Sequence, residues 1–137
     1  VSEIEQPAKR DEVRRMSKYG AKKVTLDGIT FDSKAESRYY EYLLKLKKTG
    51  VVEDFEMQKA FTLLDRFAHP QTGRIVRAIT YKADFEVIYA DGHVEVVDIK
   101  GLLTPEFKIK AKMFMFRYQI PLVLLKWSAA TKKFVEV

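Results

Sequence analysis

The chain has 137 residues and a formal net charge of +6, and 47% of its residues are hydrophobic. This length predicts one domain with one core, and the basic balance favours polyanionic partners such as nucleic acid. The absence of cysteine excludes disulfides, thiolate zinc sites and cysteine nucleophiles, and two histidines argue against a histidine-rich metal centre. The longest apolar run, residues 120–125, is too short to cross a bilayer, so we expect a soluble protein without a membrane partner.

The N-terminal region divides into an extension and the start of a compact domain. Residues 1–17 are highly charged, which predicts an extension with a short helix over residues 7–16 and a single domain over residues 18–137. The pair Asp27-Gly28 predicts a small hairpin over residues 25–31. Residues 34–48 carry apolar side chains at helical spacing, and Gly50 supplies a stop, which together predict a helix.

The middle of the chain predicts strands and one loop. Residues 51–58 have the pattern of a strand, and residues 60–64 are its continuation or its partner. Residues 65–77 contain His69-Pro70 and Thr72-Gly73, which predict a loop that extends over a substrate. Residues 81–89 and 93–99 are rich in β-branched and aromatic types and are joined by Ala90-Asp91-Gly92, so they predict a β-hairpin.

The register of this hairpin decides which side chains meet. A three-residue loop pairs Tyr89 with His93 and sets Phe85 opposite Val97, whereas a two-residue turn sets Phe85 against an aspartate. We prefer the first register because it keeps apolar residues together. It aligns Asp84 with Asp98 and puts Lys100 two residues further along the same face.

Two aspartates facing each other destabilise a ladder unless a cation lies between them. A hard divalent ion such as Mg²⁺ is held by one or two carboxylates and keeps positions for water and phosphate. The Asp84, Asp98 and Lys100 pattern therefore indicates a metal-dependent phosphodiester site. The alternative is that the aspartates are solvated edge residues with Lys100 as their structural counter-ion.

The C-terminal part predicts a second helix and two strands. Thr104-Pro105 is a typical helix opening, and the helix carries Phe107, Ala111, Phe114 and Tyr118 on one side before it ends ahead of Pro121. Residues 122–127 and 133–137 predict the last strands. The order of elements predicts an α/β fold of the α+β type, with a mixed sheet flanked by helices.

Glu36 is the best third carboxylate, because it lies in the first turn of the predicted helix beside the apolar stripe. An equally good interpretation is a capping box, in which Ser33 and Glu36 serve only to start the helix.

Several polar residues are candidates for contact with a nucleic-acid backbone. The amides at Thr104 can seat a phosphate, and Lys108 and Lys112 lie four residues apart on the same helix. Gln58 closes a strand, where it can orient water or phosphate. Lys34 and Arg38 belong to a second basic cluster. Ordinary solvated surfaces remain the alternative for each of these residues.

The order of these motifs resembles the PD-(D/E)XK nuclease superfamily. The residues that carry the resemblance are Ala83-Asp84, Asp98-Ile99-Lys100 and the preceding Glu36. The segments 31–36 and 97–101 also look like a small phage and prophage family known as a domain of unknown function, over about residues 19–118. Two departures matter, because Ala83 stands where the motif has proline and Asp98 is the shorter permitted acid.

The resemblance implies a restriction-endonuclease-like core, Mg²⁺ or Mn²⁺ dependence and hydrolysis of DNA phosphodiesters in the cytoplasm of a bacterial host. It makes Asp84, Asp98 and the Ile99 carbonyl metal ligands, Glu36 an additional ligand, and Lys100 the residue that positions the attacking water. Small basic members resemble Holliday-junction resolvases, which implies a homodimer that cuts branched DNA in phage recombination. The alternatives are an inactive DNA-binding accessory protein with the same fold and a nuclease that acts on duplexes or ends.

Overall fold

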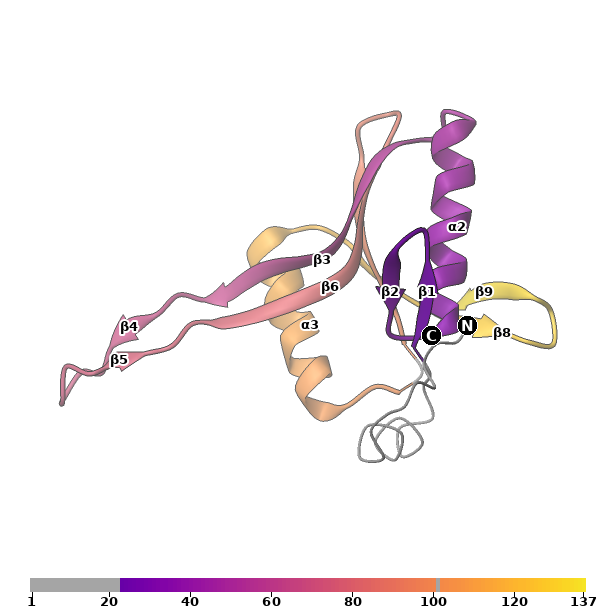
Figure 1. Cartoon of the computed structure of the whole chain (residues 1–137). Coiled ribbons are helices and arrows are strands. Elements are labelled where there is room, and N and C mark those ends of the chain that lie inside the picture. The colour runs from indigo at the N-terminus through magenta and orange to yellow at the C-terminus, as the bar shows by residue number, and fades with distance from the viewer. Residues whose placement is uncertain (1–22, 101) are drawn as a thin grey trace. The chain divides into compact units, whose positions relative to one another are not determined.

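The computed structural model describes residues 23–100 and 102–137, which form two compact units, residues 23–49 and Gly50–Val137. The predicted helix over residues 7–16 lies outside the described residues. The chain has a mixed α/β fold, whose described part contains a five-stranded mixed sheet and two α-helices (Figure 1). This agrees with the predicted mixture of helices and a mixed sheet.

The first unit contains a hairpin and one helix. Strands β1 (Val24–Leu26) and β2 (Ile29–Phe31) are antiparallel, and Asp27 and Gly28 adopt φ values of 55° and 76° in the turn. Helix α2 (Lys34–Lys48) follows, and the Ser33 hydroxyl accepts the N–H of Glu36 at 3.1 Å. The predicted hairpin, helix and Ser33 cap are therefore confirmed.

The second unit contains the five-stranded sheet, in the order β3-β6-β7-β8-β9. Only β7 and β8 run parallel; the other neighbours are antiparallel. The bounds of these strands are β3 (Val52–Leu64), β6 (Ile79–Tyr89), β7 (Val94–Ile99), β8 (Leu122–Ser128) and β9 (Lys133–Glu136). Residues 51–58 and 60–64 thus form one continuous strand, which was one of the two predicted possibilities.

Helix α3 (Pro105–Tyr118) covers one face of this sheet. Its Thr104 cap accepts the N–H of Phe107 at 3.1 Å, and Pro105 occupies the first helical position, as predicted. The helix buries Phe107, Ala111 and Phe114 against residues of three strands: Phe61, Leu63, Tyr81, Ala83 and Val96. The Phe61 and Phe114 rings pack edge to face at a centroid distance of 4.9 Å, which anchors α3 on β3.

The prediction of a loop over residues 65–77 is wrong in part. This segment contains the short strands β4 (Phe67–Ala68) and β5 (Ile75–Val76), which pair antiparallel. They continue the ribbon formed by β3 and β6 (Figure 1). Strands of two residues are too short to show an alternating pattern, and the turn residues around them dominate the sequence.

Candidate active site at the opening between β6 and β7

The hairpin of β6 and β7 has the register that keeps apolar residues together. Phe85 pairs with Val97, and the loop is closed by the N–H of Tyr89 donating to the carbonyl of His93 at 2.9 Å. Gly92 has a φ of 94°, the left-handed conformation that the three-residue loop requires. The preferred register is therefore confirmed.

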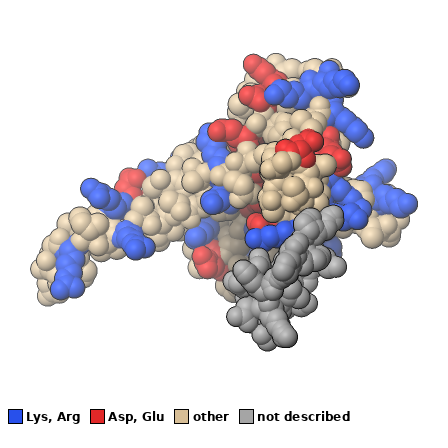
Figure 2. All heavy atoms as spheres, in the orientation of Figure 1, with Lys and Arg blue, Asp and Glu red and all other residues tan. Residues whose placement is uncertain are grey.

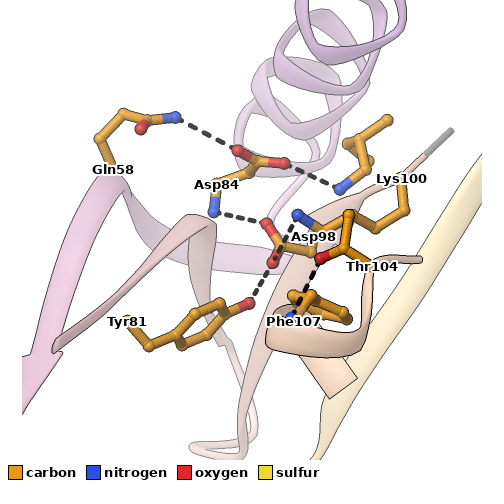
Figure 3. A network of polar contacts seen from close by, with 8 residues as sticks. Gln58, Tyr81, Asp84, Asp98, Lys100, Thr104 and Phe107 are labelled. Carbon is orange, nitrogen blue, oxygen red and sulfur yellow. Dashed lines mark hydrogen bonds and ion pairs between the residues drawn. The ribbon is translucent and has the colours of Figure 1, made fainter. Parts of the chain in front are cut away.

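The backbone ladder ends at Phe85 and Val97, one step before Asp84 and Asp98. Here the two aspartates bridge the strands with their side chains instead. Oδ1 of Asp98 accepts the N–H of Asp84 at 3.0 Å, and Oδ2 of Asp84 accepts the N–H of Ile99 at 2.8 Å (Figure 3). This pair of reciprocal hydrogen bonds holds both carboxylates at the point where the strands separate.

Strand β3 is irregular at the same level of the sheet. Gln58 has a φ of 55° and its side-chain amide donates to Oδ1 of Asp84 at 3.3 Å. Phe85 and Ala83 flank Asp84 in β6, yet Phe85 contacts Phe55, whereas Ala83 joins the cluster covered by α3. Regular alternation would put Ala83 and Phe85 on one face, so the two faces of the sheet exchange at Asp84.

This exchange of faces brings Tyr81 to the site, which the sequence pattern did not indicate. The Tyr81 hydroxyl donates to Oδ2 of Asp98. Tyr81 is buried between Phe107 and Phe114, with ring centroids at 6.0 and 5.6 Å. Burial, followed by the negative charge of Asp98, raises the pKa of Tyr81 well above its ordinary value, so the phenol stays protonated and donates. A buried phenol needs a hydrogen-bond acceptor. The presence of a tyrosine in a predicted strand was therefore the one sequence signal that could have indicated its contact with Asp98.

Lys100 supplies the positive charge of the site. Its ammonium nitrogen lies 3.7 Å from Oδ2 of Asp98, and Figure 3 shows the side chain pointing toward the two aspartates. The same nitrogen lies 4.3 Å from the centre of the Phe107 ring, in a cation–π contact. Phe107 belongs to the first turn of α3, so the Thr104 cap indirectly positions the lysine.

The two aspartates differ in exposure. Asp98 is 1% exposed, whereas Asp84 is only partly buried. Each of their oxygens already accepts one protein hydrogen bond, from Tyr81, Gln58 or a main-chain amide. A carboxylate oxygen has two lone pairs, so the pair retains acceptor capacity, most of it on the more accessible Asp84.

The predicted DNA-contacting residues fall into two groups. Gln58 and Thr104 lie beside the site, and Lys108 and Lys112 are exposed on α3. Lys34, Glu36 and Arg38 belong to the unit of residues 23–49, where Glu36 is buried in the first turn of α2. The predicted role of Glu36 as an additional metal ligand and the predicted DNA contacts of Lys34 and Arg38 stay predictions.

The chemistry of the donor set suits a hard cation. Carboxylate oxygens of Asp84 and Asp98 and the carbonyl of Ile99 are ligands of the kind that Mg²⁺ prefers, and no thiolate or imidazole competes with them here. Within residues 23–100 and 102–137, no group of three or more His, Asp or Glu side chains is arranged to hold a metal ion. A cation at this site would therefore rely on two carboxylates, main-chain oxygen, water and substrate.

The chain belongs to the family described as "protein of unknown function (DUF1064)", whose model matches residues 16–136. No curated protein and no solved structure matches it. Separately, no helix in the described part of the chain is long and apolar enough to cross a membrane.

Proposed function

We propose that this protein is a metal-dependent DNA endonuclease with a restriction-endonuclease-like core. One observation carries the proposal: Asp84 and Asp98 are locked together where two strands open, with the Lys100 ammonium 3.7 Å from Asp98. Two acids and one lysine on adjacent strands form a compact set of groups for phosphodiester hydrolysis. The basic composition is consistent with a nucleic-acid substrate.

In this mechanism a water oxygen forms a bond to phosphorus while the bond from phosphorus to one ester oxygen breaks. Asp84, Asp98 and the Ile99 carbonyl would hold Mg²⁺ or Mn²⁺. The bound ion would supply Lewis-acid stabilisation and lower the pKa of its water. The Lys100 ammonium orients the attacking water or offsets the charge that develops on the phosphate.

Neighbouring residues hold the carboxylates and the Lys100 ammonium in position before a substrate binds. Gln58 and the Ile99 amide fix the two oxygens of Asp84, and Tyr81 fixes Asp98. Phe107 holds the Lys100 ammonium over its ring. Such preorganisation avoids the cost of ordering these groups in the transition state. The amides at the start of α3, beside Thr104, favour a phosphate oxygen nearby.

The substrate that we propose is branched DNA, a Holliday junction above all, cut by a homodimer during phage recombination. Symmetrical cutting of a four-way junction requires two active sites. The support for this finer assignment is the resemblance to small basic resolvases, and it is independent of the site geometry. A nuclease that acts on duplexes or ends would use the same residues.

A cleavage panel tests the proposal. Single-stranded, duplex, flap and four-way DNA are incubated with Mg²⁺, Mn²⁺ or a chelator. We expect metal-dependent nicking that is lost in Asp84→Asn and Lys100→Gln. Asp91→Asn, in the β6–β7 turn, is the matched control because turns accept asparagine and aspartate alike. Failure of the wild type to cut any substrate with either metal would show the proposal to be wrong.

One observation favours a second candidate, an inactive DNA-binding protein with the same fold. All four oxygens of Asp84 and Asp98 have protein donors, so the pair also suits a structural clamp between β6 and β7. Titration with Mn²⁺ separates the two candidates without a cleavage assay. A nuclease site should raise the unfolding temperature as Mn²⁺ is added, and Asp84→Asn should abolish the increase. A clamp should give no increase in either protein.

A further inference from the structure

The ribbon that starts at the ends of β3 and β6, residues 64–79, is exposed at every position except Val76, which is partly buried, and we refer to it as the arm. Its apolar side chains are unusually accessible, since Phe67 is 43% and Ile75 is 60% exposed. A two-stranded ribbon in water is marginally stable at best, and exposed apolar side chains grouped together often mark a binding surface. The arm therefore has the features of a surface that contacts a partner.

The register of the arm is constant and aligns two positive charges. Leu64 pairs with Ile79, and Phe67 pairs with Val76 in the same register. This alignment sets Arg66 opposite Arg77, between the two paired segments. Like charges at opposed positions of a ribbon are destabilising, so an anionic partner would relieve their repulsion.

The charge of the arm is almost entirely basic. Arg66, Arg74 and Arg77 lie in it, and its single acidic residue, Asp65, is paired with Arg117 of α3 at 3.3 Å. In the view of Figure 2, basic side chains predominate along the arm. Exposed arginines on a narrow projection match the spaced phosphates of a nucleic acid better than they match a second copy of the same basic arm.

Both ends of the arm are held in place. At the tip, Nδ1 of His69 accepts the N–H groups of Gln71 and Thr72 at 3.1 and 3.2 Å. At the base, Arg117 donates to the carbonyl of Leu63 at 3.2 Å, and the Tyr118 hydroxyl donates to the carbonyl of Thr62 at 2.9 Å. These contacts fix the conformation of the arm before binding, which lowers the entropy cost of association.

We propose that the arm enters the major groove of B-form DNA, with Arg66, Arg74 and Arg77 on the phosphates and Ile75 or Phe67 toward the base edges. The major groove, about 12 Å wide, admits a two-stranded ribbon. The deep, narrow major groove of A-form RNA does not. The inference rests on the proposed function for the identity of the polyanion as DNA, but it concerns binding and needs no cleavage.

Binding to a fluorescent DNA duplex over a range of salt concentrations tests the arm, with Arg66→Gln/Arg77→Gln as the variant. Each lost phosphate contact should lower the slope of log K against log salt by about 0.9, so the variant should lose nearly 2. The matched control is Lys126→Gln/Lys133→Gln, which removes the same charge from exposed positions on β8 and β9. The control should keep the wild-type slope. Arg74→Gln alone should lower the slope by about 1.

The outcomes separate the arm from the catalytic proposal. The arm proposal is overturned if the arginine variants bind duplex DNA with the wild-type slope, or if an RNA duplex binds as tightly as DNA. It is also overturned if sedimentation shows that the double variant has lost a dimer instead of DNA affinity. A wild type that binds duplex DNA through the arm but cuts no substrate would support the arm and contradict the nuclease.

Discussion

The site at Asp84 and Asp98 lies between β6 and β7, and the arm of residues 64–79 continues β3 and β6, so the two regions share one strand, yet they are built in opposite ways. At the site, each of the four carboxylate oxygens accepts a hydrogen bond from a nearby donor, and Asp98 is almost completely buried. In the arm, charged and apolar side chains are exposed and like charges are aligned. Strand β6 is thus held by many internal contacts where catalytic groups must be positioned, and its extension leaves side chains exposed where a partner could supply the missing interactions.

The largest effect is expected where buried donors lose their acceptor. Asp98→Ala would leave the Tyr81 hydroxyl and the Asp84 amide without partners, at a cost of about 2–5 kcal/mol in the free energy of unfolding. Asp98→Asn keeps the volume and one acceptor, so it should cost about half as much. Urea unfolding measures both. Equal stability of wild type and Asp98→Ala would mean that the hydrogen bonds at the strand opening contribute nothing.

Tyr81→Phe is expected to have the next largest effect, about 1–3 kcal/mol at pH 7, because Oδ2 of Asp98 loses a buried donor. The pKa of Tyr81 is raised in the folded state, so an unfolded tyrosine ionises first, near pH 10. The stability that results is complete below pH 10 and falls as the pH rises above it. Tyr81→Phe should therefore lose less stability than the wild type between pH 9 and pH 11. Tyr42→Phe, at a half-exposed position, is the control at pH 7. If the unfolding free energy of Tyr81→Phe fell more steeply with pH than that of the wild type, this account would be contradicted.

A smaller effect is expected from the ring that supports Lys100. Phe107→Leu removes the cation–π contact but keeps an apolar side chain, which should cost about 1 kcal/mol of stability. If Lys100 acts in cleavage, the rate constant should fall a few-fold while DNA affinity stays constant. Single-turnover cleavage and fluorescence anisotropy measure the two quantities. A loss of affinity without a loss of rate would show that Phe107 has another role.

The smallest effect on stability is expected in the arm, in contrast with the site. Replacing residues 66–77 by Asn-Gly joins the paired ends through a tight turn and removes side chains that are all exposed except the partly buried Val76. The free energy of unfolding should change by no more than about 0.5 kcal/mol. The same protein should lose most of its affinity for duplex DNA. A large destabilisation would mean that the arm supports the fold and is no separate binding element.

Local signals in the sequence predicted most of the elements. Asp27-Gly28 marked the first hairpin, and Thr104-Pro105 marked the start of α3, because these residue types fit the backbone conformations of turns and caps. The apolar pattern of residues 81–99 also selected the correct register, since a slip by one residue would have buried polar side chains.

The apolar pattern did not predict where the regular pairing of β6 and β7 ends. Tyr81 lies seventeen residues from Asp98 in the chain, and alternation assigns it to the opposite face from Asp84. Only the irregular step at Gln58 and Asp84 brings its hydroxyl to the carboxylate. The strands of the arm were not predicted for a related reason. They are two residues long, too short to show an alternating pattern, and they are defined only by their pairing with each other.

The amino-acid pattern was therefore sufficient for the types of most elements, the caps, the hairpin register and the proximity of two acids and one lysine. Each of these depends on neighbours within a few residues or on strict alternation. The tertiary structure decided the reciprocal bonds between β6 and β7, the partner of Asp98 and the exposure of the arm. These features depend on contacts between segments that are distant in the chain, at places where the regular strand geometry ends. A local sequence pattern contains no information about such contacts.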